Sequence, residues 1–321
     1  DLSLATYFAS RLSTNPNWNE AESKTIFELL IPNSYKDFVR NHRNIEWRMD
    51  PYTAQFPWEM FHDFNFGDKP TFTEAGLIRQ LILKSPPDDP AIVTSNTALV
   101  IGDPVYNTEG LGQLNGAKAE AQAVKGILSN NSIESDLLIG SNPVTIMKHL
   151  YAKKYKILHI AAHGFFDPEN DKVGIAIGHG QVLSPGTIRQ LSSIPEFVFI
   201  NCCHSGTINV ELENYYNNRN HLAANVGTEL IRMGVKAVVV TGWAVHDGAA
   251  RLFAETLYRQ LYQGAYFGDA IRNARKSCYE SYPDYNTWGA YQCYGDQFYR
   301  LSRKNGREGD DDIPSIETEI I

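Results

Sequence analysis

The sequence predicts an α/β fold: a mostly parallel sheet flanked by helices on both faces, with a smaller N-terminal α+β section. From residue 97 onward, short apolar runs alternate with segments of about 10–15 residues that are rich in helix-forming side chains. The apolar runs lack regular alternation with polar residues, which is typical of strands buried on both faces of a parallel sheet. These two observations together predict the fold class.

The clearest break in the chain is Lys84–Asn96, where three prolines and two acidic residues interrupt any regular element. A length of 321 residues is compatible with two domains. We therefore expect an N-terminal section over residues 1–84, a linker over 85–96, a second domain over 97–303 and an acidic C-terminal tail over 304–321.

The N-terminal section is expected to contain two strands and one helix. The apolar runs Thr25–Ile31 and Ile45–Met49 predict strands, and Thr73–Leu83 predicts a short helix. The aromatic-rich segment Phe56–Phe66 is expected to pack against the next section as core filler.

The second domain is expected to alternate strands with helices. The predicted strands are Thr97–Ile101, Asp136–Ile139, Lys156–Ala162, Phe197–Asn201, Lys236–Thr241 and Trp288–Tyr294. The predicted helices are Gly116–Leu128, Pro143–Lys153, Leu222–Met233, Gly248–Gln263 and Asp269–Tyr282. In such sheets, binding and catalytic sites form beyond the carboxyl ends of the strands, so we expect functional residues directly after each strand.

Charge and cysteine content narrow the functional class. The net charge of −8 argues against a nucleic-acid-binding protein, and six acidic residues with one arginine in 307–321 supply most of it. No run approaches about 18 apolar residues and no signal peptide is visible, so we expect no membrane association. The four cysteines include an adjacent pair and form no disulfide framework, which favours a reducing, cytoplasmic setting.

Two predicted strands end in reactive side chains. Lys156–Ala162 is followed by His163 and Gly164, and Phe197–Asn201 runs into Cys202-Cys203-His204-Ser205-Gly206. If the strands are neighbours, an imidazole and a thiol meet at one edge of the sheet, where the imidazole can generate the thiolate. Glycines after each reactive residue let backbone N–H groups approach a substrate carbonyl. This combination indicates acyl-transfer chemistry.

A zinc site is the alternative for the same residues. His159, His163, Cys203 and His204 are all of ligand type. We expect no metal, because the first two lie on a predicted strand, no second Cys/His pair has zinc-finger spacing and adjacent cysteines chelate poorly. His159 is interpreted as a core histidine.

The blocks Ala162–Gly164 (AHG) and Cys202–Gly206 (CCHSG) resemble those of caspase-like cysteine peptidases, the second being especially similar to metacaspases. The rest of the chain is similar to the CHAT branch of that group, over about residues 25–300. Supporting blocks are Phe27–Pro32, Pro57–Met60, Ala98–Tyr106, Leu114–Ala121, Trp243–Asp247 and Trp288–Asp296. The resemblance implies a caspase-like sheet.

The resemblance also implies the role of each catalytic residue. Cys203 is at the nucleophile position and His163 at the general base and acid position, with the backbone amides of Gly164 and Cys203 as oxyanion hole. Cys202 is then a small neighbour that fills space. The implied chemistry needs no cofactor.

Substrate specificity is expected to come from Glu120, Asn201 and the loop that carries Trp243 and Asp247, which match the positions that line the S1 pocket of caspase-like folds. Two carboxylates and no arginine favour a basic residue such as Arg at P1, the position before the scissile bond, or a P1 residue without a strong charge. Asn201 stands where metacaspases carry Asp, which removes one charge. Glu120 as a solvated helix residue, Asp247 as a helix N-cap and Trp243 as core are the alternatives.

The resemblance implies a regulated effector protease, a cysteine endopeptidase of the kind often found in bacterial defence or conflict systems. Its expected partners are a protein substrate and a regulatory sensor domain or activator protein. A catalytically silent caspase-like scaffold used for binding is the alternative, although intact His163 and Cys203 argue against it.

Overall fold

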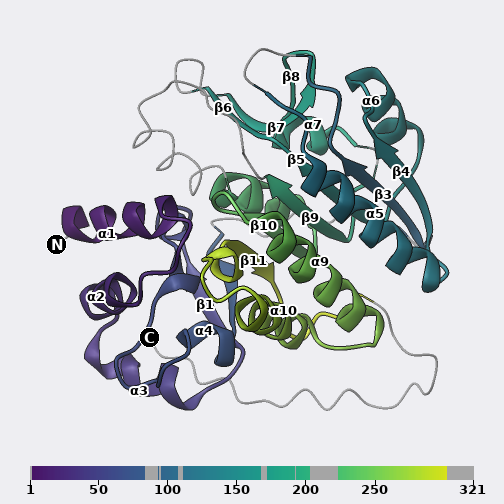
Figure 1. Ribbon diagram of the computed structural model, residues 1–321. Helices are drawn as coiled ribbons and strands as arrows, with labels where there is room; N and C mark the ends of the chain where they lie inside the picture. The colour runs from purple at the N-terminus through teal and green to yellow at the C-terminus, as the bar shows by residue number, and fades with distance from the viewer. Residues whose placement is uncertain are drawn as a thin grey trace.

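The computed structural model describes residues 2–83, 93, 95–107, 111–167, 172–191, 193–202 and 223–301. These residues contain a central sheet of eight strands (Figure 1). The strands are β1 (Ile45–Met49), β2 (Leu77–Leu81), β3 (Thr97–Gly102), β4 (Glu134–Ile139), β5 (Ile157–Ala162), β9 (Phe197–Cys202), β10 (Ala237–Thr241) and β11 (Tyr291–Gly295). Their order is β1-β2-β11-β10-β9-β5-β3-β4, and every neighbouring pair is parallel except β10 with β11. The predicted fold class is confirmed.

Helices cover both faces of the sheet. One face packs against α5 (Asn115–Asn130), α9 (Asp247–Tyr262) and α10 (Phe267–Ser281), which Figure 1 shows side by side. The other face packs against α6 (Pro143–Ala152), α7 (Pro185–Arg189) and the helical residues 223–232. Predicted helices in the second domain therefore match observed ones, to within a few residues at their ends.

Each central strand contributes apolar side chains to both faces. On β10, Val239 belongs to the cluster under α9 and α10, whereas Val238 and Val240 belong to the cluster on the opposite face. Burying one such side chain contributes about 1.5–3 kcal/mol. Burial on both faces explains why the strands show no polar alternation in the sequence.

The predicted strand Thr25–Ile31 is wrong, because residues 25–30 belong to a helix. Helix α2 spans Glu20–Leu30, between α1 (Leu2–Thr14) and α3 (Asn33–Asn41). It begins at Asn19, whose side chain accepts a hydrogen bond from the backbone N–H of Glu22 and so caps the helix. The capping residue lies outside the apolar run that suggested a strand.

The predicted helix Thr73–Leu83 is also wrong over most of its length. Helix α4 spans Thr71–Glu74 and is followed by Gly76, whose φ of +77° lies in the left-handed region that glycine adopts readily. The chain then enters β2, parallel to β1. The strand predicted at Ile45–Met49 is confirmed as β1.

The N-terminal section shares the sheet of the second domain, because β2 pairs with β11. Arg79 of β2 is fully buried and donates two hydrogen bonds to Glu59, at 2.8 and 2.5 Å. Trp58 and Phe61 belong to the cluster that also holds residues of α9 and α10, which confirms the packing expected for the segment 56–66. Residues 84–92 and 94, which include most of the proposed linker, lie outside the described residues, and the division into domains stays a prediction.

A small antiparallel sheet follows β5 directly and was not predicted. Its strands are β6 (Gly164–Asp167), β7 (Lys172–Gly178) and β8 (Gln181–Leu183). Ile175 and Ile177 of β7 pack into the cluster on the face of α6 and α7. The predicted strand Trp288–Tyr294 begins as a 3₁₀ turn, Thr287–Gly289, before it becomes β11.

Candidate active site at the carboxyl ends of the strands

Strands β5 and β9 are parallel neighbours, as the sequence analysis required. Their register ends with Ala162 opposite Cys202. His163 is the next residue after β5, and Cys203 is the next residue of the chain after β9. Cys203 lies outside the described residues, so its role as nucleophile stays a prediction. The described structure does bring together the two strand ends that these residues follow.

His163 is buried and held by a backbone carbonyl. Its side chain has no solvent exposure, and Nε2 lies 2.7 Å from the carbonyl oxygen of Gly112. A carbonyl oxygen can only accept, so Nε2 carries the proton that is donated in this bond. In the neutral ring Nδ1 then carries the lone pair, which is the form a general base requires.

Tyr106 supports the same histidine from the loop after β3. Its hydroxyl accepts a hydrogen bond of 3.2 Å from the backbone N–H of His163, and the two rings meet edge to face with centroids 4.6 Å apart. Burial raises the pKa of the Tyr106 hydroxyl, so this group stays protonated. Sequence reasoning quoted Tyr106 within a motif block but assigned it no role.

The loop that carries Gly112 is closed by Asp103, the residue directly after β3. Asp103 has a φ of +49°, and its Oδ1 accepts a hydrogen bond of 2.7 Å from the backbone N–H of Leu114. The bond ties the start of the loop to its end, just before α5. Sequence reasoning missed the Gly112 carbonyl altogether, because a backbone acceptor leaves no mark on the sequence.

Cys202 is buried at the end of β9. Its side chain belongs to the apolar cluster on the face of α6 and α7, and its backbone N–H donates a hydrogen bond of 2.7 Å to Thr241 Oγ1. No group of three or more possible metal ligands gathers among the residues that the structure describes. His204, which the zinc alternative requires together with Cys203, lies outside them.

Glu120 and Asn201 lie together beneath the strand ends. Glu120 of α5 is 1% exposed, and its Oε2 accepts a hydrogen bond of 2.7 Å from Asn201 Nδ2. Its Oε1 lies 3.3 Å from Nε2 of His159, a buried residue whose Nδ1 lies 3.3 Å from the Tyr258 hydroxyl. Glu120 is therefore not a solvated helix residue, and its carboxylate is hydrogen-bonded to Asn201 and lies against His159.

The two remaining specificity candidates differ in exposure. Trp243 is 1% exposed, and its indole N–H donates a hydrogen bond of 3.0 Å to Asn286 Oδ1. Asp247 is exposed and is the first residue of α9, whose N-cap is His246 and not Asp247. A Cβ atom on Gly116, at the start of α5, would meet the Asp247 carboxylate at 2.2 Å. Asp247 thus places an exposed negative charge against the first turn of α5.

The family model of the CHAT domain matches residues 20–296. The chain belongs to the CHAT domain family. Among solved structures, this CHAT domain is similar to the Arg-specific cysteine proteinase gingipain R (RgpB), at 11% identity and a TM-score of 0.53, covering 92% of this chain and 75% of that chain. The complex of the pro- and mature domains of Porphyromonas gingivalis RgpB gives a TM-score of 0.54 at 11% identity, covering 92% and 76%.

The separase of Saccharomyces cerevisiae, solved with securin, gives a TM-score of 0.42 at 13% identity. That match covers 77% of this chain and 15% of the separase chain. No curated protein sequence matches the CHAT domain described above. The family match and the likeness to gingipain confirm the expected resemblance: the fold is that of the caspase-like cysteine peptidases. No helix in the described ranges is long and apolar enough to cross a membrane.

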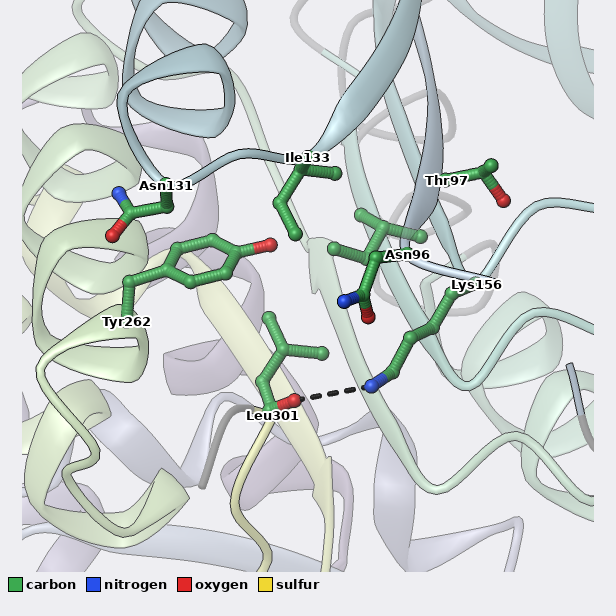
Figure 2. Close-up of a pocket in the computed structure, with 8 residues that line it drawn as sticks. Asn96, Thr97, Asn131, Ile133, Lys156, Tyr262 and Leu301 are labelled. Carbon is green, nitrogen blue, oxygen red and sulfur yellow. Dashed lines mark hydrogen bonds between the residues drawn. The ribbon is translucent and has the colours of Figure 1, made fainter. Parts of the chain in front are cut away.

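A polar cavity of about 190 Å³ lies at the opposite, amino-terminal end of the strands in this CHAT domain. Figure 2 shows it between the start of β3, the end of α9 and Leu301, with the Lys156 ammonium bonded to the Leu301 carbonyl oxygen. Asn131 and Tyr262 also line it. Its position separates it from the strand ends that carry His163.

Proposed function

We propose that this CHAT domain is a cysteine endopeptidase with a catalytic dyad of His163 and Cys203. One observation carries the proposal: the register of β5 and β9 ends at Ala162 and Cys202, one residue before each member of the dyad. The proton that His163 Nε2 donates to Gly112 leaves Nδ1 as the basic nitrogen, which supports the same conclusion.

In the proposed reaction, His163 Nδ1 takes the proton of the Cys203 thiol, and the thiolate attacks the carbonyl carbon of the scissile peptide bond. The carbonyl electrons move to the oxygen, which the backbone amides of Gly164 and Cys203 stabilise as an oxyanion hole. The C–N bond then breaks as His163 returns the proton to the leaving amine. Water, deprotonated by His163, hydrolyses the thioester and restores the thiol.

The Gly112 carbonyl stabilises the charged intermediate of this cycle. When Nδ1 takes the proton, the imidazolium donates from both nitrogens, and the bond from Nε2 to the carbonyl becomes charge-assisted. Charge-assisted hydrogen bonds contribute about 1.5–3 kcal/mol, more than neutral ones. The fully buried His163 has little water to replace this bond.

We propose a preference for a basic P1 residue, with Asp247 as the principal acidic group. Asp247 is exposed, whereas Glu120 is covered and already engaged. Among the described residues none donates a hydrogen bond to Asn201 Oδ1, so this buried acceptor supports recognition of a donor such as a guanidinium. Trp243 is the proposed apolar wall.

The proposed partners are a protein substrate and a regulatory sensor domain or activator protein, in a cytoplasmic defence or conflict system. The gingipain structure solved as a complex of pro- and mature domains is an example of this fold bound by a protein segment. The modest net charge of the chain outside residues 307–321 supports proteins over nucleic acids as substrates.

The test uses the full chain and two matched variants, Cys203→Ala and Cys202→Ala. Cleavage of a peptide library and labelling by a thiol-reactive peptide probe are measured with and without candidate activators. We expect Cys203→Ala to abolish both signals, and Cys202→Ala, a substitution in the adjacent apolar cluster, to retain both. If the wild-type chain shows neither cleavage nor labelling, the binding scaffold is the correct function.

A further inference from the structure

Asn286 occupies a junction between two segments that are far apart in the sequence. It is 1% exposed and lies just before the 3₁₀ turn that leads into β11. Its Oδ1 accepts the indole N–H of Trp243 at 3.0 Å. Its Nδ2 donates to the carbonyl oxygens of Leu12 at 3.0 Å and Asn15 at 2.5 Å, at the end of α1. One side-chain amide thus holds both segments.

Backbone groups reinforce each side of the junction. The backbone N–H of Asn286 donates to the Pro16 carbonyl oxygen at 2.8 Å, on the side of α1. On the other side, the backbone N–H of His246 donates to Thr287 Oγ1 at 3.0 Å. The loop 243–247 is therefore bound to Asn286 and to the adjacent Thr287, and the segment 12–16 is bound to Asn286.

Only one of the two joined segments lies within the residues that the CHAT family model matches. Residues 12–16 lie outside the range 20–296 that the CHAT model matches. The loop 243–247 follows β10 and carries Asp247 to the start of α5, at the proposed specificity pocket. A segment outside the family match is thus linked through Asn286 to a loop of the proposed active site.

We propose that Asn286 is a positioning residue that couples the end of α1 to the loop 243–247, so that displacement of α1 lowers the affinity for substrate. A buried amide can accept from the indole and donate to two carbonyls at once. If either side moves, a buried polar group loses its partner, so the positions of the two segments are energetically linked. The functional part of this proposal rests on the proposed peptidase activity.

Asn286→Asp removes the side-chain hydrogen bonds on one side of the junction and keeps the one on the other side. The carboxylate still accepts from Trp243 but cannot donate to the carbonyls of Leu12 and Asn15, which it repels. Hydrogen exchange of the full-length protein is measured by mass spectrometry at 12–17 and 243–247. We expect about 10-fold faster exchange at 12–17, where the hydrogen bonds to the carbonyls of Leu12 and Asn15 are lost, and faster exchange at 243–247 as well, because the two segments are coupled. Faster exchange at 12–17 with an unchanged loop would overturn the coupling.

Two further variants keep the test decisive. Thr287→Val has nearly the same shape and removes only the acceptor of the His246 N–H, and faster exchange is expected at 12–17 as well as in the loop, because coupling is reciprocal. This variant decides the question if Asn286→Asp does not fold. Asn131→Ala, which removes an amide bonded to a helix carbonyl at the far end of the sheet, should change neither segment.

The activity readout separates positioning from simple destabilisation. With peptide substrates, Asn286→Asp is expected to raise KM about 10-fold while kcat stays within about twofold and labelling of Cys203 is unchanged. An equal loss of kcat and labelling, or an unchanged KM, would refute the positioning role. If the wild-type chain cleaves no peptide, the proposed peptidase function fails while the exchange experiment still decides the coupling.

Discussion

Asp247 and Glu120 provide the sharpest test of how this chain selects its substrate, because the structure assigns them different environments. Asp247→Asn removes an exposed carboxylate at the start of α9, and Glu120→Gln removes a buried one from α5. We expect the first substitution to change specificity and the second to change stability. Both replacements preserve side-chain size, so the loss of charge is the perturbation in each case.

The expected magnitudes follow from these contacts. A hydrogen bond between a P1 guanidinium and the Asp247 carboxylate contributes about 1.5–3 kcal/mol, which corresponds to roughly 10- to 150-fold in kcat/KM. Gln at position 120 keeps an oxygen for Asn201 Nδ2, but the carboxylate charge that lies 3.3 Å from His159 Nε2 is lost. That loss costs about 1–3 kcal/mol of unfolding free energy, and Tm falls by about 2–6 °C.

The assay compares peptides that are identical except for arginine or citrulline at P1, since citrulline has the shape of arginine without its charge. Asp247→Asn should lower kcat/KM for the arginine peptide and leave the citrulline peptide nearly unchanged. Glu255→Gln, on the same helix α9, is the matched control and should retain the preference. An unchanged arginine preference in Asp247→Asn, or a wild-type preference for an acidic P1 residue, would refute the reasoning.

Two further predictions concern burial. Arg79→Met should lower the unfolding free energy by about 3–5 kcal/mol in chemical denaturation, because the buried Glu59 keeps only its longer ion pair with Arg275 and two backbone carbonyls lose their donor. Arg259→Met, at an exposed ion pair, should cost under about 1 kcal/mol, and equal losses would contradict this account. Burial raises the pKa of the Cys278 and Cys293 thiols to about 12, so at pH 8 only about one molecule in ten thousand carries either thiolate. Iodoacetamide should therefore label them only after unfolding, and mass spectrometry showing rapid labelling of the native chain at pH 8 would contradict their burial.

The fold class was predictable because long-range burial leaves a local pattern. Strands covered on both faces are apolar throughout, and the helices between them have good helix formers and capping residues within a few positions. The errors fall where a short apolar run is ambiguous between helix and strand. Residues 25–30 are helical because Asn19 caps a helix that begins before them. A positive-φ glycine, Gly76, follows the short helix α4 where the sequence suggested a longer one.

The candidate site was predictable only in part. His163 follows a recognisable strand and carries chemistry in its side chain, so a sequence pattern indicates it. The Gly112 carbonyl that selects its tautomer is a backbone group, and any residue type at that position supplies one. The Tyr106 hydroxyl and the Asn286 amide act across 57 and 43 residues of chain, so their partners become known only when the loops are placed.

The sequence by itself determined which chemical groups this CHAT domain has available: an imidazole and a thiol after two apolar strands, and two carboxylates for specificity. The tertiary structure decided what each carboxylate can do. Packing of α5 against β5 and β9 covers Glu120 and pairs it with Asn201 and His159, whereas Asp247 stays exposed beside Gly116. Burial depends on which distant segments of the chain cover a residue, and the local sequence around that residue does not indicate which segments these are.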